Sequence, residues 1–222
     1  LFKLPKDMIK TNIIEIAVSP DKNKLAVAYE TLPPGEQDKH DFIIRVFNMS
    51  GKSIYRGNNL FMPRFLELFG STANMKWLDN ESLVLEDNVT KGSQFDFNII
   101  NVNVNTGNKT TMVQHAFKPV VLPGKALMKV ESFKDFGTGE SNIDIIKNGK
   151  KIRSFKARPY QYDNFIFADE NTLVYNEGET LLVYYIDKGR SEMLGTGHII
   201  GLTEDGSQVY YMTNHKDLYY ID

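Results

Sequence analysis

Short apolar stretches alternate with turn sequences along the whole chain. The clearest example is residues 13–30, IIEIAVSPDKNKLAVAYE, where Ile14, Ile16 and Val18 alternate with Glu15 and Ala17. A period of two is typical of a β-strand with one buried face. The central Ser-Pro-Asp is a turn sequence, because proline presets φ and the aspartate side chain bonds to nearby amides. This stretch therefore predicts a β-hairpin.

Degenerate copies of this hairpin recur toward the C-terminus. The turns that precede an apolar strand are Ser19-Pro20-Asp21, Leu78-Asp79-Asn80, Leu122-Pro123-Gly124, Ala168-Asp169-Glu170 and Glu204-Asp205-Gly206. A second set of turns, at Gly51, Gly107, Gly149 and Gly189, follows later in the units, and we expect positive φ at these glycines. Repeats of roughly 40 to 50 residues are typical of propellers and solenoids. Each unit predicts four antiparallel strands, and five units are present.

The two ends of the chain predict that the fifth unit is completed from the N-terminus. Residues 218–222 resemble residues 183–187, so the chain stops after the third strand of the fifth unit. Residues 1–4 alternate apolar with polar side chains and can supply the missing strand, which would remove an exposed edge. We therefore expect an all-β fold with a single domain over residues 1–222. The expected fold is a five-bladed β-propeller of four-stranded antiparallel blades, closed by the N-terminal strand in the last blade.

These turns and their period resemble those of TolB-like and WD40-like β-propellers. The resemblance covers nearly the whole chain and concerns the fold, which hosts many functions. The marks of true WD40 repeats are lacking, because Gly197-His198 is a lone match to Gly-His and no unit ends in Trp-Asp.

Composition narrows the function classes. The net charge of -2 and the pI near 6.1 give no general attraction to nucleic acid or to anionic membranes. No apolar run approaches the roughly 20 residues of a membrane helix, so we expect no membrane insertion within this segment. The absence of cysteine excludes disulfides and thiolate chemistry and is compatible with an extracytoplasmic location. The chain begins at Leu1, and we expect an excised piece whose targeting segment lies upstream.

The long connections of the predicted blades lie opposite the short turns and hold the candidate binding residues. One of them, residues 59–70, has a possible cap at Asn59, Pro63 in a first turn and Gly70 at the end, and predicts the single helix of the chain. Its aromatic side chains either contact a partner or plug the channel mouth. Loops carry function more often than the scaffold beneath them. The candidate binding residues are His40, Phe61, Arg64, Phe65, His115, Arg158, Tyr160, Tyr162 and His198.

Catalytic and metal-binding alternatives find less support. The four histidines are isolated in the sequence, so they do not predict a zinc site. Asp21, Asp79, Asp169 and Asp205 occupy repeated turn positions and predict turn caps. Some five-bladed propellers are glycosidases with carboxylates around the channel. The carboxylates that such an enzyme would use here are Glu15, Asp87, Glu131, Asp163 and Glu177.

Three function classes remain open. The sequence favours a non-catalytic propeller that binds a protein or peptide partner, as the extracytoplasmic sensing or interaction part of a larger membrane-anchored or secreted protein. A propeller that binds or cleaves a glycan is the alternative, and a structural module of a larger enzyme, such as a gate beside a peptidase, is the third class. We expect a monomer with no cofactor and no metal.

Overall fold

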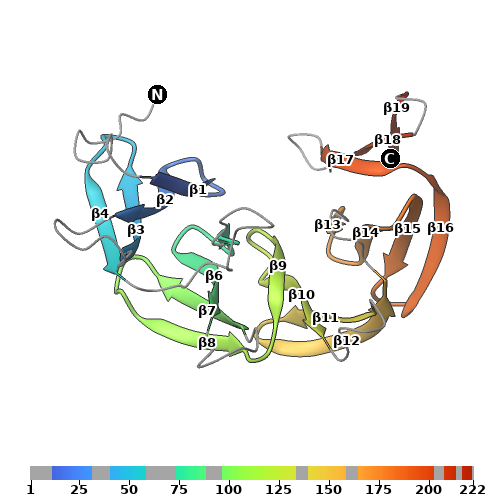
Figure 1. The fold of residues 1–222 in the computed structure, drawn as a ribbon, viewed down its shortest axis with the longest axis horizontal. Coiled ribbons are helices and arrows are strands. Elements are labelled where there is room, and N and C mark those ends of the chain that lie inside the picture. The colour runs from blue at the N-terminus through green and yellow to red at the C-terminus, as the bar shows by residue number, and fades with distance from the viewer. Residues whose placement is uncertain are drawn as a thin grey trace. The chain divides into compact units, whose positions relative to one another are not determined.

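The computed structural model describes residues 12–31, 41–58, 74–88, 97–133, 140–158, 165–202, 208–213 and 217–221. The chain falls into two compact units, Leu1–Pro119 and Val120–Asp222. All regular elements in the described residues are β-strands, in five antiparallel sheets whose strands follow one another in chain order (Figure 1).

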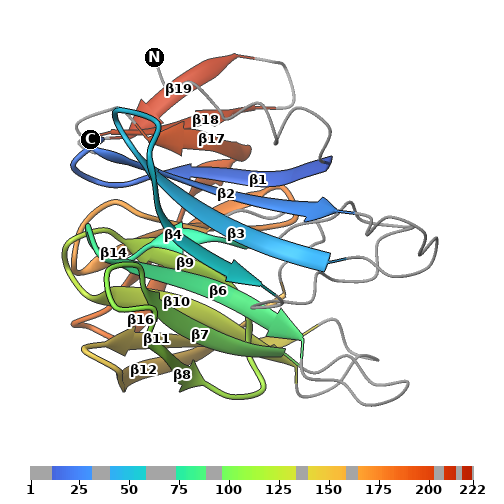
Figure 2. The same cartoon turned by 90° about the vertical axis from the view of Figure 1, so that its left-hand side faces the viewer.

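The first unit contains two four-stranded sheets. Figure 2 shows the strands of the first sheet lying next to one another in the order β1-β2-β3-β4. They are β1 (Asn12–Val18), β2 (Lys24–Thr31), β3 (Asp41–Asn48) and β4 (Ser53–Asn58). The second sheet has the order β5-β6-β7-β8 and consists of β5 (Lys76–Trp77), β6 (Ser82–Asn88), β7 (Phe97–Asn103) and β8 (Lys109–Val113). The predicted hairpin over residues 13–30 is confirmed by the antiparallel pairing of β1 with β2.

The second unit contains the other three sheets, and the first strand of its first sheet, β9, spans the boundary between the units. That sheet consists of β9 (Phe117–Leu122), β10 (Leu127–Phe133), β11 (Ser141–Lys147) and β12 (Lys150–Ala157). The next consists of β13 (Phe165–Phe167), β14 (Thr172–Glu177), β15 (Thr180–Tyr185) and β16 (Arg190–Thr196). The last has three described strands, β17 (His198–Leu202), β18 (Val209–Met212) and β19 (Leu218–Ile221).

The predicted turn chemistry is confirmed wherever the structure describes it. The carboxylate of Asp21 accepts hydrogen bonds from the Ser19 hydroxyl at 2.6 Å and from the Asn23 amide at 3.1 Å. Asp79 accepts bonds from two backbone amides, and Asp169 from one amide and the Thr172 hydroxyl, so all three aspartates cap turns. The glycines of the second set of turns all have positive φ, with values of 79° at Gly51, 77° at Gly107, 72° at Gly149 and 66° at Gly189. Asp205 lies outside the described residues.

The hydrophobic cores lie between consecutive sheets within each unit. In the first unit, Ala26 and Val46 of the first sheet pack with Trp77 and Leu85 of the second. The indole Nε1 of Trp77 also donates to the Ala17 carbonyl oxygen at 3.1 Å, so that the two sheets share a hydrogen bond as well as apolar contact. In the second unit, one core joins the sheets of β10–β12 and β13–β15, and a second joins β14 and β15 to β17 and β18. Burial of these side chains between sheets supplies the main stabilising term.

The alternation predicted for β1 is interrupted. The register of the β1–β2 pair shifts between Ile13 and Glu15, which turns the following side chains. Ile14 and Ala17 pack against the core of the first unit, whereas Ile16 and Val18 are 51% and 52% exposed. The predicted helix at residues 59–70 and the closing strand at residues 1–4 lie outside the described residues.

Candidate functional site

Three of the nine candidate binding residues lie in the described part of the chain, namely His115, Arg158 and His198. All three are exposed, and each lies at or beside the end of a strand. Outside the described residues are His40, Phe61, Arg64, Phe65, Tyr160 and Tyr162. The candidate site is therefore built here from the three described residues and from the strand ends that hold them.

Arg158 is positioned by the end of β14 in the neighbouring sheet. Strand β12 ends at Ala157, and the backbone N–H of Arg158 donates to Glu177 Oε1 at 3.1 Å. Glu177 is the last residue of β14. Because the backbone makes this bond, it fixes where the chain leaves β12 and leaves the Arg158 guanidinium exposed. Such a guanidinium can recognise a carboxylate or phosphate through two parallel hydrogen bonds.

His198 is positioned by Asn176, which precedes Glu177 near the end of β14. The buried Asn176 side chain donates from Nδ2 to the Gly197 carbonyl oxygen at 2.6 Å and accepts from the Ile199 amide at 3.1 Å. Gly197 has φ of 154°, and a Cβ there would lie 2.8 Å from the Met212 carbonyl oxygen. The backbone on both sides of His198 is thereby held, and the imidazole is exposed at the start of β17. At the end of β14, Glu177 thus bonds the Arg158 backbone, and Asn176 bonds the backbone of the residues on both sides of His198.

His115 lies in the first unit, in the connection from β8 to β9. Its backbone is left-handed, with φ of 54°, and its N–H donates to Asn98 Oδ1 at 3.3 Å. The next residue, Ala116, is buried, and its amide donates to the Phe97 carbonyl oxygen at 2.8 Å. The imidazole is therefore exposed on a connection whose backbone is fixed on both sides.

The carboxylates that a glycosidase would use have mainly structural contacts. Glu15 accepts from the Met75 amide at 3.1 Å and from Lys76 Nζ at 3.1 Å, which ties β1 to the start of the second sheet. Glu131 is fully buried in an ion pair with Lys129, and Glu177 holds the Arg158 backbone. Asp87 differs, because burial raises the pKa of its half-buried carboxyl while Lys109 opposes the shift. Asp163 lies outside the described residues.

Sequence reasoning missed two buried charged residues on second strands. The Lys129 side chain is 1% exposed, and its ammonium lies 3.7 Å from the centroid of the Phe165 ring while it pairs with Glu131. Glu86 is also buried; it contacts Asn74 Nδ2 and accepts from the Lys118 amide at 3.3 Å. The available signal was a charge inside an apolar strand, as in LMKVE at residues 127–131. Such burial requires a partner that only the folded chain brings near.

The described residues lack two further features, a metal-binding cluster and a membrane-spanning helix. They contain no group of three or more histidine and acidic side chains arranged to hold a metal ion. They also contain no helix long and apolar enough to cross a membrane.

The chain matches no protein-family model and no curated protein. Solved structures resemble it in fold. The β-propeller domain of the Trilobed protease from Pyrococcus furiosus aligns with a TM-score of 0.67 and 12% identity, over 96% of this chain and 69% of that chain. Pyrococcus horikoshii acylaminoacyl peptidase aligns with a TM-score of 0.65 and 11% identity, over 100% of this chain and 40% of that one. TolB from Acinetobacter baumannii aligns with a TM-score of 0.52 and 15% identity, over 96% and 52%.

These similarities, together with the four-stranded antiparallel sheets, confirm a β-propeller fold. At identities of 11% to 15% they concern the fold alone. The chain spans about two fifths of the length of the Pyrococcus horikoshii peptidase and about half of TolB.

Proposed function

We propose that this chain is a non-catalytic β-propeller that binds a protein or peptide partner through the strand ends opposite its short turns. The observation that best supports this proposal is how residues near the end of β14 hold the neighbouring backbone. Buried or acidic side chains hold the backbone there, while Arg158 and His198 are left exposed. An exposed arginine on a fixed backbone loses little freedom on binding, and arginine is enriched among residues that dominate binding energy.

The same contacts count against the glycosidase alternative. A retaining or inverting glycosidase needs two carboxyl groups facing a sugar. In the described residues, Glu15, Glu131 and Glu177 contact protein donors instead. A panel of aryl glycosides is expected to show no turnover above buffer, and turnover abolished by Glu15→Gln would establish the enzyme instead.

The proposal includes ring closure. We propose one domain of five blades in which residues 1–4 pair with the last three-stranded sheet. Two observations support this. In the first unit, β1 leaves Ile16 and Val18 exposed, and in the second unit, Leu218 and Tyr220 of β19 are 63% and 59% exposed. Large apolar side chains gathered on a sheet face favour a covering element.

The proposed location is extracytoplasmic, supported by the absence of cysteine and by the TolB-like fold. A second candidate is a propeller module of a larger enzyme. It is favoured by the likeness to the propeller domain of the Trilobed protease. The full open reading frame separates the two, because an adjoining peptidase domain would favour the module.

The test of partner binding compares substitutions in the long connections with substitutions at the short turns on the opposite side. The purified chain is used to capture partners, each captured protein is identified and purified, and its Kd is measured directly. Arg158→Ala, alone and combined with Arg64→Ala, should weaken binding about tenfold or more per anchor while leaving the melting temperature unchanged. Lys22→Ala and Lys52→Ala, at the short turns, are the matched controls. Binding that is lost only with the turn substitutions would overturn the proposed assignment.

A further inference from the structure

The outer strand β12 has an unusual concentration of positive charge. It contains Lys150, Lys151, Arg153 and Lys156, it has no acidic residue, and Arg158 follows it directly. All five residues are exposed. Residues 140–158 hold six cationic and two acidic side chains, a net charge of +4 in a chain whose total is -2.

Edge protection does not account for this charge. Strands at sheet edges commonly use a lysine or a β-bulge to prevent unwanted pairing. The outer strands β4, β8, β12 and β16 each have a register shift against their inner neighbour. The other outer strands have one cationic residue each, Arg56 in β4, Lys109 in β8 and Arg190 in β16, and the last of these is paired with Glu192 at 2.7 Å. Strand β12 has four cationic residues, four times as many as each of these strands.

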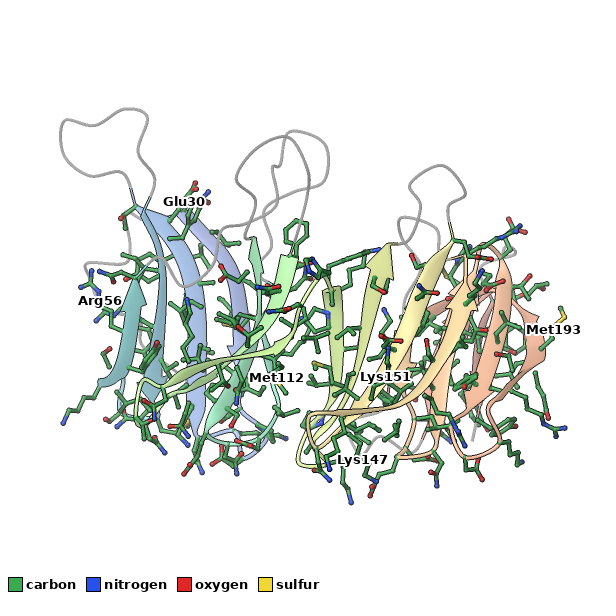
Figure 3. All side chains as sticks on the ribbon, turned by 90° about the horizontal axis from the view of Figure 1, so that it is seen from below. Glu30, Arg56, Met112, Lys147, Lys151 and Met193 are labelled. Carbon is green, nitrogen blue, oxygen red and sulfur yellow. The ribbon has the colours of Figure 1, made fainter. Side chains whose placement is uncertain are left out.

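The fold itself uses part of this charge. Arg153 donates to the Ile186 and Asp187 carbonyl oxygens at 2.7 and 3.0 Å, which ties β12 to the next sheet. Lys151, which Figure 3 labels, pairs with Asp144 at 3.1 Å. Lys156 pairs with Glu140 at 2.6 Å, yet its side chain remains 64% exposed. Lys150 and Lys156 therefore present their charge to solvent near the two ends of the strand.

We propose that β12 is a docking edge for an acidic, extended segment of a partner protein, which adds to the sheet as a further strand. Strand β12 is the last in the order β12-β11-β10-β9, so one side of its backbone can pair with an added strand. The cations would select acidic segments and repel basic ones, including β12 of a second copy. Ile152, which is 40% exposed, offers an apolar contact between the charges. The docking edge is formed by residues 150–157, whereas Arg158, just past the end of β12, belongs to the binding site at the strand ends.

The probe is a fluorescent peptide of about eight residues, the length of a typical strand, that alternates glutamate with threonine and valine. Anisotropy should show saturable binding that weakens as salt rises. Lys150→Gln combined with Lys156→Gln should weaken binding about threefold to tenfold, since exposed charge pairs contribute modestly. The matched control, Lys109→Gln with Arg190→Gln, removes the same charge from other outer strands and should leave binding unchanged.

Strand addition is tested separately from charge attraction. Hydrogen exchange should show that the peptide protects amides of residues 153–157, and a peptide with prolines at alternate positions should not bind, because proline lacks the amide donor. Equal binding of the proline peptide would overturn the proposal, as would equal loss in both charge variants. Tight binding to heparin or anionic vesicles with none to the peptide would also overturn it. Arg64→Ala should leave peptide binding intact, so this test is independent of the strand-end site.

Discussion

At the scale of single residues, a half-buried carboxylate joins turns of neighbouring sheets. Glu170, between β13 and β14, pairs with Lys125 at 2.9 Å and with Lys147 at 3.0 Å, and both lysines belong to the preceding sheet. Hydrogen bonds from these two ammonium groups lower the pKa of the Glu170 carboxyl. A group whose pKa is lower in the folded chain stabilises the fold when ionised.

We expect Glu170→Gln to lower the melting temperature by about 2 °C near neutral pH, because exposed pairs contribute little individually. The difference should be present above the ordinary glutamate pKa, near 4.5. It should disappear as the pH falls through the lower pKa of the folded chain, where Glu170 becomes protonated. Thermal melts of both proteins across this range test it. Glu179→Gln, in the exposed turn after β14, is the control, and a pH-independent difference would contradict the assignment.

At the scale of elements, the buried side-chain amide of Asn176 connects β14 with the start of the last sheet. Asn176→Ala removes both hydrogen bonds of that side chain and leaves the Gly197 carbonyl and the Ile199 amide without them. We expect the free energy of unfolding to fall by about 3 kcal/mol, because unsatisfied buried groups lose their solvation as well as the bond. Urea denaturation measures this. Asn108→Ala, at an exposed turn, should change it by less than about 0.5 kcal/mol.

The elements that sequence predicts best are those defined by local chemistry. The Asp21 turn and the Gly51 turn were predicted because each needs only residues a few positions apart. Ties between sheets were not predicted, since Glu15 and Met75 are 60 positions apart and nothing local marks them as partners. For the same reason, loop position predicted Arg158 and His198 as exposed, but not that Glu177 and Asn176 would hold them.

At the scale of the whole molecule, the proposed closure makes the two ends of the chain important for stability. We expect deletion of residues 1–6 to lower the melting temperature substantially, in one cooperative transition, because it would expose a strand edge and apolar side chains. Differential scanning calorimetry measures this. Lys3→Ser with Lys6→Ser keeps the apolar positions and is the control. A truncated chain that melts like the parent would remove the argument for closure.

Each described strand pairs only with strands next to it in the sequence, from β1 through β19. A growing polypeptide can therefore complete each of the four four-stranded sheets as soon as its last strand leaves the ribosome. In the proposed closure, the strand at residues 1–4 alone waits for a distant partner, the last sheet. Aggregation-prone edges are then exposed only briefly during synthesis. We expect arrested nascent chains that end after β4, β8, β12 or β16 to show stepwise gains in protease resistance.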